Sequence, residues 1–279
     1  MKDRTGKPTQ VIVVTDLDGT LLDQQTYRYD TCLPVIQRLQ SLRIPLILCS
    51  SKTHAEILPL WEELCLSTPF IVENGGAIYF PEQAFPFPIE EARAKGKFKF
   101  LELGTEISIL RKALRETAHQ NGVGLRSFGS MSLDEVARLT GLKRSDSALA
   151  AKREYDEPFV IEGEDRENLH TALTAKGFTV VEGDRFCHLT GGNDKGRAVT
   201  TLLELYRRSD PSVFSVGLGN SANDIGFLSQ VDRPIVIRNP DGTWDPEVIK
   251  RIPTVQRSHG IGPRGWREAM EKVLVSVGL

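Results

Sequence analysis

The sequence predicts an α/β protein: a doubly wound, Rossmann-like parallel sheet with an inserted α+β cap domain. Patterns typical of strands and helices alternate over residues 11–81 and again over 195–277, and a less regular stretch separates the two blocks. Strand–helix–strand repeats of this kind favour a parallel sheet. The apolar run 11–15 ends abruptly in Asp16-Leu17-Asp18-Gly19-Thr20, which is typical of a buried strand opening into a loop at the ligand-binding edge of the sheet.

The first block contains the elements expected around that strand. Asp30 or Thr31 is suited to cap a helix whose apolar positions are Val35, Ile36, Leu39 and Leu42. The dipeptide Asn74-Gly75 between two apolar runs indicates a tight turn. The other expected elements of this block are strands at 44–49, 70–72 and 77–80 and a helix at 54–64, which contains Pro59.

The pattern changes after residue 81. The segment 81–99 is rich in Pro, Phe, Lys and Ala and is expected to be a loop or domain boundary. The expected elements beyond it are strands at 98–103 and 159–162, helices at 106–120 and about 165–176, a helix starting at the capping box Ser132–Glu135, and a hairpin of 178–182 with 185–190 around Gly183-Asp184. Gly177 is placed to end the helix before it.

The last block again alternates helices and strands, as residues 11–81 do. Its expected elements are helices at 195–206, 225–231 and 265–277 and strands at 212–218 and 234–237. The economical arrangement is a discontinuous core of residues 1–82 and 190–279, with residues 83–189 inserted as a cap that closes over the substrate.

Composition narrows the functional classes. The chain has 279 residues, a net charge of −2 and 40% apolar residues, which is ordinary for a globular protein and gives no reason to expect nucleic acid or an anionic membrane as a partner. No apolar run approaches the roughly 20 residues needed to span a bilayer, and the polar start lacks a secretory signal. Four cysteines without Cys-x-x-Cys spacing are expected to be thiols rather than a zinc site or disulfides. We expect a cytoplasmic protein.

Asp16 and Asp18 are the strongest candidates for chemistry. Asp16 directly follows the strand, so it is suited to attack phosphorus and form an aspartyl-phosphate. Asp18 is suited to protonate the leaving oxygen and then to activate water. Because two carboxylates repel a phosphate dianion, we expect Mg²⁺ as cofactor. Taken alone, this segment also fits a surface turn.

Three later features place further polar groups at strand ends. Ser50, Ser51, Lys52 and Thr53 follow the strand 44–49, and their hydroxyls are suited to phosphoryl oxygens or to capping the next helix. Lys195 precedes a helix and is suited to hold an ammonium against the phosphoryl group, although most lysines are exposed. Asn220 and Asp224 follow the strand 212–218, where they complete a metal shell or cap a helix.

In this order, these motifs resemble the haloacid dehalogenase superfamily, in the branch with a large α/β cap between the second and third motifs. The resemblance implies Mg²⁺-dependent phosphoryl transfer with Asp16 as nucleophile and Asp18 as acid/base. It implies catalytic roles for Ser50 and Lys195 and metal binding by Asp16, Asp18, Asn220 and Asp224. The family usually has Asp at the position of Asn220, so we expect weaker Mg²⁺ binding here.

A finer resemblance rests on Ser51-Lys52-Thr53 and on the segments 70–76, 151–157 and 194–199. These are similar to the mannosyl-3-phosphoglycerate phosphatase family, which implies a small phosphorylated sugar–glycerate substrate. The residues expected to contact it are Ser51, Lys52, Thr53, Glu73, Asn74, Arg153, Glu154, Tyr155, Asp156 and His188. A solvated charge run before the strand 159–161 and a simple Asn74-Gly75 turn are the plainer interpretations.

Three alternatives stay open at this point. The substrate is a glucosyl-3-phosphoglycerate or another sugar phosphate instead, or the protein transfers phosphate to a sugar hydroxyl rather than to water. A non-catalytic sugar-phosphate binding module is the third, with Asn220 as the sign of a lost metal. The sequence leaves the oligomeric state open.

Overall fold

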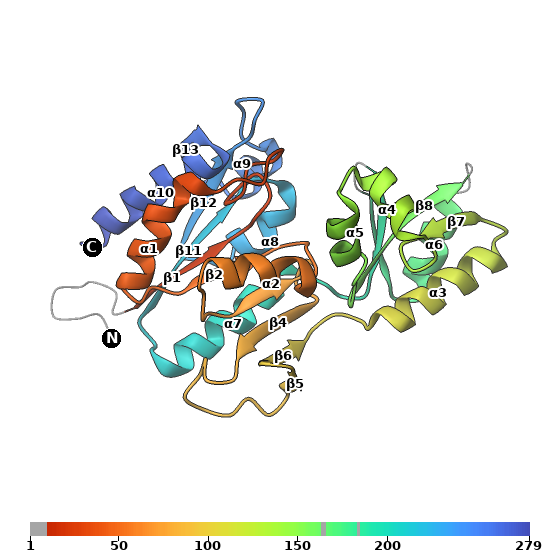
Figure 1. Cartoon of the computed structure of the whole chain (residues 1–279), viewed down its shortest axis with the longest axis horizontal. Coiled ribbons are helices and arrows are strands. Elements are labelled where there is room, and N and C mark those ends of the chain that lie inside the picture. The colour runs from red at the N-terminus through yellow and green to blue at the C-terminus, as the bar shows by residue number, and fades with distance from the viewer. Residues whose placement is uncertain (1–9, 163–165, 183–184) are drawn as a thin grey trace.

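Nine strands form the larger sheet in the computed structural model, which describes residues 10–162, 166–182 and 185–279 (Figure 1). They are β1 (Gln10–Thr15), β2 (Leu46–Cys49), β3 (Phe70–Val72), β4 (Ala77–Pro81), β5 (Arg93–Lys95), β6 (Phe98–Glu102), β11 (Val213–Gly219), β12 (Arg233–Arg238) and β13 (Gln256–Ile261). Their order is β13-β12-β11-β1-β2-β3-β4-β6-β5. The first six in this order run parallel, and β4, β6 and β5 add an antiparallel edge.

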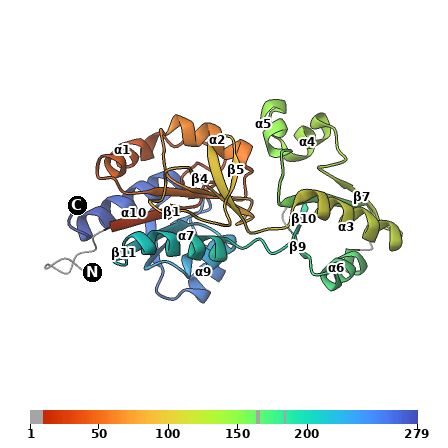
Figure 2. The same cartoon turned by 90° about the horizontal axis from the view of Figure 1, so that it is seen from below.

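Helices cover both faces of this sheet, as the sequence predicts. Successive residues of a strand point to opposite faces, so Val11 and Val13 pack on one side of β1 while Ile12 and Val14 pack on the other. The first side carries α1 (Leu33–Ser41), α2 (His54–Glu63) and α10 (Gly262–Ser276), and the second carries α7 (Lys195–Ser209), α8 (Ile225–Leu228) and α9 (Pro246–Arg251) (Figure 2). Two single turns of 3₁₀ helix, η1 (Asp30–Cys32) and η2 (Ala222–Asp224), precede α1 and α8.

The other parallel strands lie on both sides of β1, so β1 stands where the order of the sheet reverses. β2 and β3 follow on one side of β1, whereas β11, β12 and β13 lie on the other. Such a change of direction opens a crevice at the carboxyl ends of the central strands. The loop after β1, beginning at Asp16, enters this crevice beside the end of β11.

The cap is a separate antiparallel sheet in the order β7-β8-β10-β9, formed by β7 (Gly124–Ser127), β8 (Asp156–Glu162), β9 (Thr179–Glu182) and β10 (Cys187–Thr190). The helices α3 (Ile107–Gln120) and α6 (Arg166–Ala175) pack on one face through Leu110, Leu114, Leu169 and Leu173. The helices α4 (Leu133–Thr140) and α5 (Arg144–Ala150) lie on the other side of the cap, and α5 is next to α2 of the core (Figure 2).

The start of the cap differs from the prediction. β6 pairs with β4 along its whole length, from Ala77↔Glu102 to Pro81↔Phe98, and β5 pairs with β6. Residues 93–102 therefore belong to the core sheet, and the predicted boundary at residue 83 is wrong. The two crossings between core and cap lie between β6 and α3 and between β10 and α7.

Several elements were not predicted: β5, β7, α5, α9 and β13. The hairpin of β9 and β10 forms as expected, although its turn Gly183-Asp184 and the predicted helix start at Asp165 lie outside the described residues, as does the polar start 1–9. Among the described helices, none is long and apolar enough to cross a bilayer.

Candidate active site

Asp16 and Asp18 lie at the carboxyl end of β1. The Asp16 amide donates to the carbonyl of Leu218 on β11 at 2.9 Å, which continues the sheet pairing by one residue and holds Asp16 in the crevice. The loop then turns at Gly19, whose φ is +76°. A Cβ at this position would lie 2.6 Å from the Asn220 side-chain nitrogen, so only glycine lets the two loops approach this closely.

Lys195 joins two of the predicted carboxylates. Its Nζ lies 2.8 Å from Asp16 Oδ1 and 2.8 Å from Asp224 Oδ1, and its side chain is 2% exposed. Lys195 is the first residue of α7, where the Asp194 side chain caps the helix by accepting from the amides of Gly196 and Arg197. Strand end and helix start thus bring together residues 179 positions apart.

The second oxygen of Asp224 organises its own loop. Asp224 Oδ2 accepts from the amides of Asn220 at 2.9 Å and Ser221 at 3.2 Å. The predicted alternative of helix capping is therefore present, since Ser221 and Asp224 form the capping box of η2. Capping and the contact with Lys195 use different oxygens of the same carboxylate, so one does not exclude the other.

The buried charges of this cluster shift one another. Burial raises the pKa of Asp16 and the nearby Asp224 carboxylate raises it further, while the Lys195 ammonium opposes both. For Lys195, burial favours the neutral amine, but the two carboxylates outweigh it and raise its pKa above the ordinary value. Lys195 therefore stays an ammonium ion.

Asp18 pairs with Lys52 from the next loop. Lys52 Nζ lies 2.9 Å from Asp18 Oδ2, and its side chain is 19% exposed. Burial acts to lower the pKa of Lys52, but Asp18, Glu56 and Tyr27 together outweigh it and the net shift is upward. The other oxygen, Asp18 Oδ1, is buried and has no hydrogen-bond partner.

The donor set fits a hard divalent cation. Asp16, Asp18 and Asp224 supply carboxylate oxygens from neighbouring loops, and an unpartnered buried acceptor such as Asp18 Oδ1 is costly unless something occupies it. Mg²⁺ prefers such oxygen ligands. The residues present therefore fit Mg²⁺.

Asn220 lies in the same cluster, but hydrogen bonds hold its amide. Its Oδ1 accepts from the Thr20 hydroxyl at 3.1 Å and its Nδ2 donates to Asn239 Oδ1 at 2.9 Å. Asn239 in turn donates to the Asn220 carbonyl at 3.2 Å. We did not predict roles for Thr20 and Asn239, although Asn239 directly follows β12 and the strand-end argument would have found it.

The segment after β2 combines the predicted phosphate ligands with local structure. Ser50 is 1% exposed, and its hydroxyl accepts from the Lys52 amide at 3.2 Å. Thr53 caps α2 in a capping box with Glu56, and its hydroxyl also donates to the Leu149 carbonyl of the cap at 3.1 Å. Ser51 offers its carbonyl to Arg153 Nη1 at 2.9 Å. The segment that follows β2 therefore contacts the cap as well as the core.

Glu73 and Arg153 connect the two domains, and we call their contacts the cap–core joint. The buried Glu73 carboxylate accepts from the amides of Glu154 and Tyr155, at 2.9 Å each. Arg153 donates to the carbonyls of Ala150 and Ser51 at 3.0 and 2.9 Å. Burial raises the pKa of Glu73 to about 7, against the opposing charge of Arg153. Glu73 has a φ of +47°, a strained value for a residue with a side chain.

One asparagine, Asn193, belongs to the cap–core joint, and a second, Asn74, joins two loops of the core. Asn193 donates to the carbonyls of Glu73 at 2.8 Å and Tyr155 at 2.9 Å, and its own Oδ1 is buried without a partner. Asn74, which the sequence placed in a tight turn, has a φ of +56° in the β3–β4 hairpin and accepts from the Asn223 side chain at 3.0 Å. The sequence analysis predicted no role for Asn193, although it lies two residues before Lys195.

The remaining predicted substrate ligands form two separate groups: Asp156 and His188 pair with each other, and Glu154 and Tyr155 line a different cavity. His188 Nδ1 lies 2.9 Å from the buried Asp156 carboxylate, which also pairs with Arg153 at 3.4 Å. The Glu154 carboxylate accepts from the Tyr79 hydroxyl at 2.8 Å, and the Tyr155 hydroxyl donates to Glu102 at 3.2 Å. Glu154 and Tyr155 line a cavity of about 340 Å³ whose walls do not include Asp16, Asp18, Lys195 or Asp224.

A cleft of about 400 Å³ opens between core and cap on the Lys52 side. Its walls include Tyr27 and Glu56 of the core and Leu142 and Leu149 of the cap. Lys52, which forms the ion pair with Asp18, also lines this cleft. A larger cavity of about 490 Å³ lies at the amino ends of β1 and β2, away from Asp16, and contains none of the predicted site residues.

Comparison with known proteins adds independent findings. The haloacid dehalogenase-like hydrolase model matches residues 13–102. A relative from Methanococcoides burtonii, named glucosyl-3-phosphoglycerate/mannosyl-3-phosphoglycerate phosphatase, is 38% identical and covers 93% of this chain and 95% of its own. A relative of the same name from Persephonella marina is 34% identical and covers 95% and 97%.

A third relative and a solved structure agree with these. The mannosyl-3-phosphoglycerate phosphatase of Pyrococcus furiosus is 36% identical and covers 81% of this chain and 90% of its own. A haloacid dehalogenase-like hydrolase structure from Bacteroides thetaiotaomicron superposes with a TM-score of 0.66 at 18% identity, covering 95% and 100% of the two chains. At that identity the superposition establishes the fold alone.

Proposed function

Because the chain belongs to the haloacid dehalogenase-like hydrolases and is a phosphatase, we propose that it hydrolyses glycosyl-3-phosphoglycerates. Mannosyl-3-phosphoglycerate is the first candidate substrate, with mannosylglycerate and phosphate as products. Glucosyl-3-phosphoglycerate is the second, since the names of two relatives include both sugars. The observation that carries the chemistry is Lys195 held between Asp16 and Asp224, at 2.8 Å from each.

The proposed reaction uses Asp16 and Asp18 in two steps. An Asp16 oxygen attacks phosphorus, the bond from phosphorus to the glycerate oxygen breaks, and Asp18 gives its proton to that oxygen. Water then attacks the aspartyl-phosphate, Asp18 takes the proton of that water, and phosphate leaves with the Asp16 carboxylate restored. Lys195 fixes the Asp16 carboxylate and offers positive charge next to the transferring group.

Asp16, Asp18 and Asp224 would hold the Mg²⁺ ion, with the Asn220 amide oxygen beside them. When bound, Mg²⁺ offsets the negative charge of the phosphate and orients it. The Ser50 hydroxyl, which is buried and follows β2, would donate to phosphoryl oxygens in this proposal.

The cleft beside Asp18 is our proposed position for the sugar–glycerate part of the substrate. The acid that protonates the leaving oxygen must face the leaving group, and Asp18 pairs with Lys52, which lines this cleft. The Lys52 ammonium is suited to the glycerate carboxylate, and Glu56 and Asp146 in the walls are suited to sugar hydroxyls. Arg153 acts as a positioning residue, because it holds the Ser51 carbonyl next to Lys52.

Phosphate release tests this proposal. Mannosyl-3-phosphoglycerate, glucosyl-3-phosphoglycerate and mannose 6-phosphate are compared in Mg²⁺ and in EDTA, with Asp16→Asn as the inactive control. We expect fast release from the glycosyl phosphoglycerates only, lost in EDTA and in the variant. Equal slow release from all three would remove the substrate assignment and keep the chemistry. Binding without release in Mg²⁺ would favour the binding module, and phosphate found on a sugar hydroxyl would favour a phosphotransferase.

A further inference from the structure

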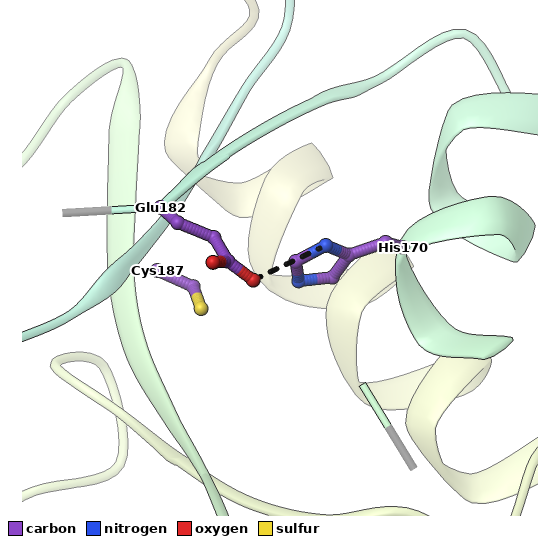
Figure 3. A group of neighbouring side chains, drawn as sticks. All are labelled: His170, Glu182 and Cys187. Carbon is purple, nitrogen blue, oxygen red and sulfur yellow. Dashed lines mark ion pairs between the residues drawn. The ribbon is translucent and has the colours of Figure 1, made fainter. Parts of the chain in front are cut away.

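A second group of metal-ligating side chains lies inside the cap, outside the catalytic cluster. His170 of α6, Glu182 at the end of β9 and Cys187 at the start of β10 place one ligand atom each within 4.8 Å of the others. Figure 3 shows the imidazole, carboxylate and thiol turned toward one another from these elements. None of the three belongs to the predicted catalytic or substrate-binding residues.

The protein's own contacts leave this group incompletely satisfied. His170 Nε2 is buried and has no hydrogen-bond partner. His170 Nδ1 and Glu182 Oε1 are 3.8 Å apart, which is too long for a hydrogen bond. Cys187 is 5% exposed and forms no disulfide. A buried imidazole nitrogen without a partner costs free energy, so the arrangement calls for an occupant.

We propose that His170, Glu182 and Cys187 form a binding site for a borderline-soft divalent cation, with Zn²⁺ as the best fit. One nitrogen, one carboxylate oxygen and one thiolate sulfur are ligands that Zn²⁺ accepts and that Mg²⁺, which prefers oxygen alone, does not. A thiolate and a carboxylate also balance the two charges of the ion. Water would occupy the fourth tetrahedral position.

The ligand atoms need only a small contraction to bind the ion. Bonds of about 2.0 to 2.3 Å from a tetrahedral Zn²⁺ place ligand atoms roughly 3.3 to 3.8 Å apart. The present separations reach up to 4.8 Å. The Glu182 side chain is 56% exposed and its ion pair with Arg166 is long, at 3.9 Å, whereas Cys187 is buried and paired in the sheet with Phe159 and Glu182.

A bound ion would act as a brace in the cap. β9 is the edge strand of the cap sheet, and His170 on α6 has no backbone pairing with it. The ion would link the helix α6, the edge strand β9 and the inner strand β10. Its ligand on β10, Cys187, directly precedes His188, which pairs with Asp156. The site is therefore structural, separate in place and in metal preference from the carboxylate cluster of the core.

Cobalt binding in excess Mg²⁺ tests the site without relying on phosphatase activity. The full chain is stripped with a chelator, returned to excess Mg²⁺ to fill the oxygen site, and titrated with Co²⁺ while thiolate-to-cobalt charge-transfer absorption is recorded. We expect one equivalent with that band in the wild type. In Cys187→Ser the band disappears, and His170→Gln and Glu182→Gln bind at least about 10-fold more weakly. One equivalent of Zn²⁺ should raise the Tm of the wild type by several degrees and leave Cys187→Ser unchanged.

Cys65→Ser and His119→Gln are the matched controls, because both residues are exposed and far from the group in sequence. They should keep the band and the Zn²⁺ response. Circular dichroism checks that each variant folds, and Glu182→Gln, at a half-exposed position, carries the test if Cys187→Ser does not fold. A wild type without the band, or a folded Cys187→Ser that keeps it, would overturn the proposal.

Discussion

The core cluster and the cap–core joint contain similar residues but use them in different ways. In the core, charged groups meet one another: Lys195 contacts Asp16 and Asp224, and Asp18 keeps one buried oxygen without a partner. In the cap–core joint, charged side chains form hydrogen bonds with the backbone: Glu73 accepts from two amides, and Arg153 donates to two carbonyls. The unpartnered Asp18 oxygen lies among the residues of the proposed chemistry, whereas the backbone contacts of Glu73 and Arg153 hold the two domains in position.

The largest effect is expected from Lys195→Met. Without the ammonium, Asp16 and Asp224 face each other as buried carboxylates, which costs about 3–5 kcal/mol of unfolding free energy. Phosphate release should fall by about 10³-fold. Lys95→Met, at an exposed ion pair with Glu154, is the control and should cost under about 1 kcal/mol. Denaturant unfolding measures both; equal stability of the two variants would contradict a charged core cluster.

A pH-dependent effect is expected from Glu73, whose pKa is raised by burial to about 7 from an ordinary 4.5. The folded state then holds a proton that the unfolded chain has released, so this group's stabilising contribution is full below about pH 4.5 and is lost as the pH rises to about 7. The full change is on the order of 3 kcal/mol.

Glu73→Gln isolates this contribution. Unfolding free energies of the wild type and the variant are compared from pH 4.5 to pH 8, and their difference should shift against the wild type as the pH rises. Glu116→Gln, at an exposed helix position paired with Lys112, should follow the wild type throughout. A pH-independent difference for Glu73→Gln would mean that Glu73 keeps the same proton occupancy in both states.

A smaller effect, confined to large substrates, is expected from Arg153→Lys. Lysine lacks the fork that reaches Ala150, Ser51 and Asp156 together, so the cap loses its hold on the loop before α2. We expect kcat/KM for a glycosyl phosphoglycerate to fall about 10-fold, and that for a small aryl phosphate to change less than about twofold. Arg126→Lys, at an ion pair within the cap, is the control. Equal losses on both substrates would place Arg153 in the chemistry of the core instead.

The smallest effect is expected from Asn220→Asp. An added carboxylate beside Asp16, Asp18 and Asp224 should tighten Mg²⁺ by about 1 kcal/mol, or roughly fivefold. The Asn239 amide must then turn its nitrogen toward position 220, because its oxygen now accepts from Asn220. A Mg²⁺ titration of activity measures the change, with the exposed Asn223→Asp as control. An unchanged midpoint would show that position 220 does not set the metal affinity.

The fold was predictable where burial imposes a pattern. β1 and β2 are almost wholly buried apolar runs, and the helices beside them have clear apolar faces. β5 has the opposite character: all three residues, Arg93–Lys95, are exposed and its pairing with β6 is what makes it a strand. Edge strands of this kind have no periodic signal, which is why the cap was predicted to begin too early.

The grouping of the acidic residues was predictable because the carboxyl ends of adjacent parallel strands lie at the same edge of the sheet. Asp16, Asp18 and Asp224 follow strands that are adjacent in the sheet, and Lys195 was singled out by its place before a helix. The contacts of Asn193 and Asn239 depend on which loops meet across the core, and a lone asparagine carries no such information.

The sequence by itself determined the doubly wound core, the carboxyl-end position of the acidic residues and the family, because each follows from local burial patterns or short motifs. Only the tertiary structure decided where the cap begins, that Glu73 and Arg153 hold backbone groups across the two domains, and that His170, Glu182 and Cys187 meet. These depend on the packing of segments distant in sequence. A side chain's partner there is set by the position of another element, which no local pattern encodes.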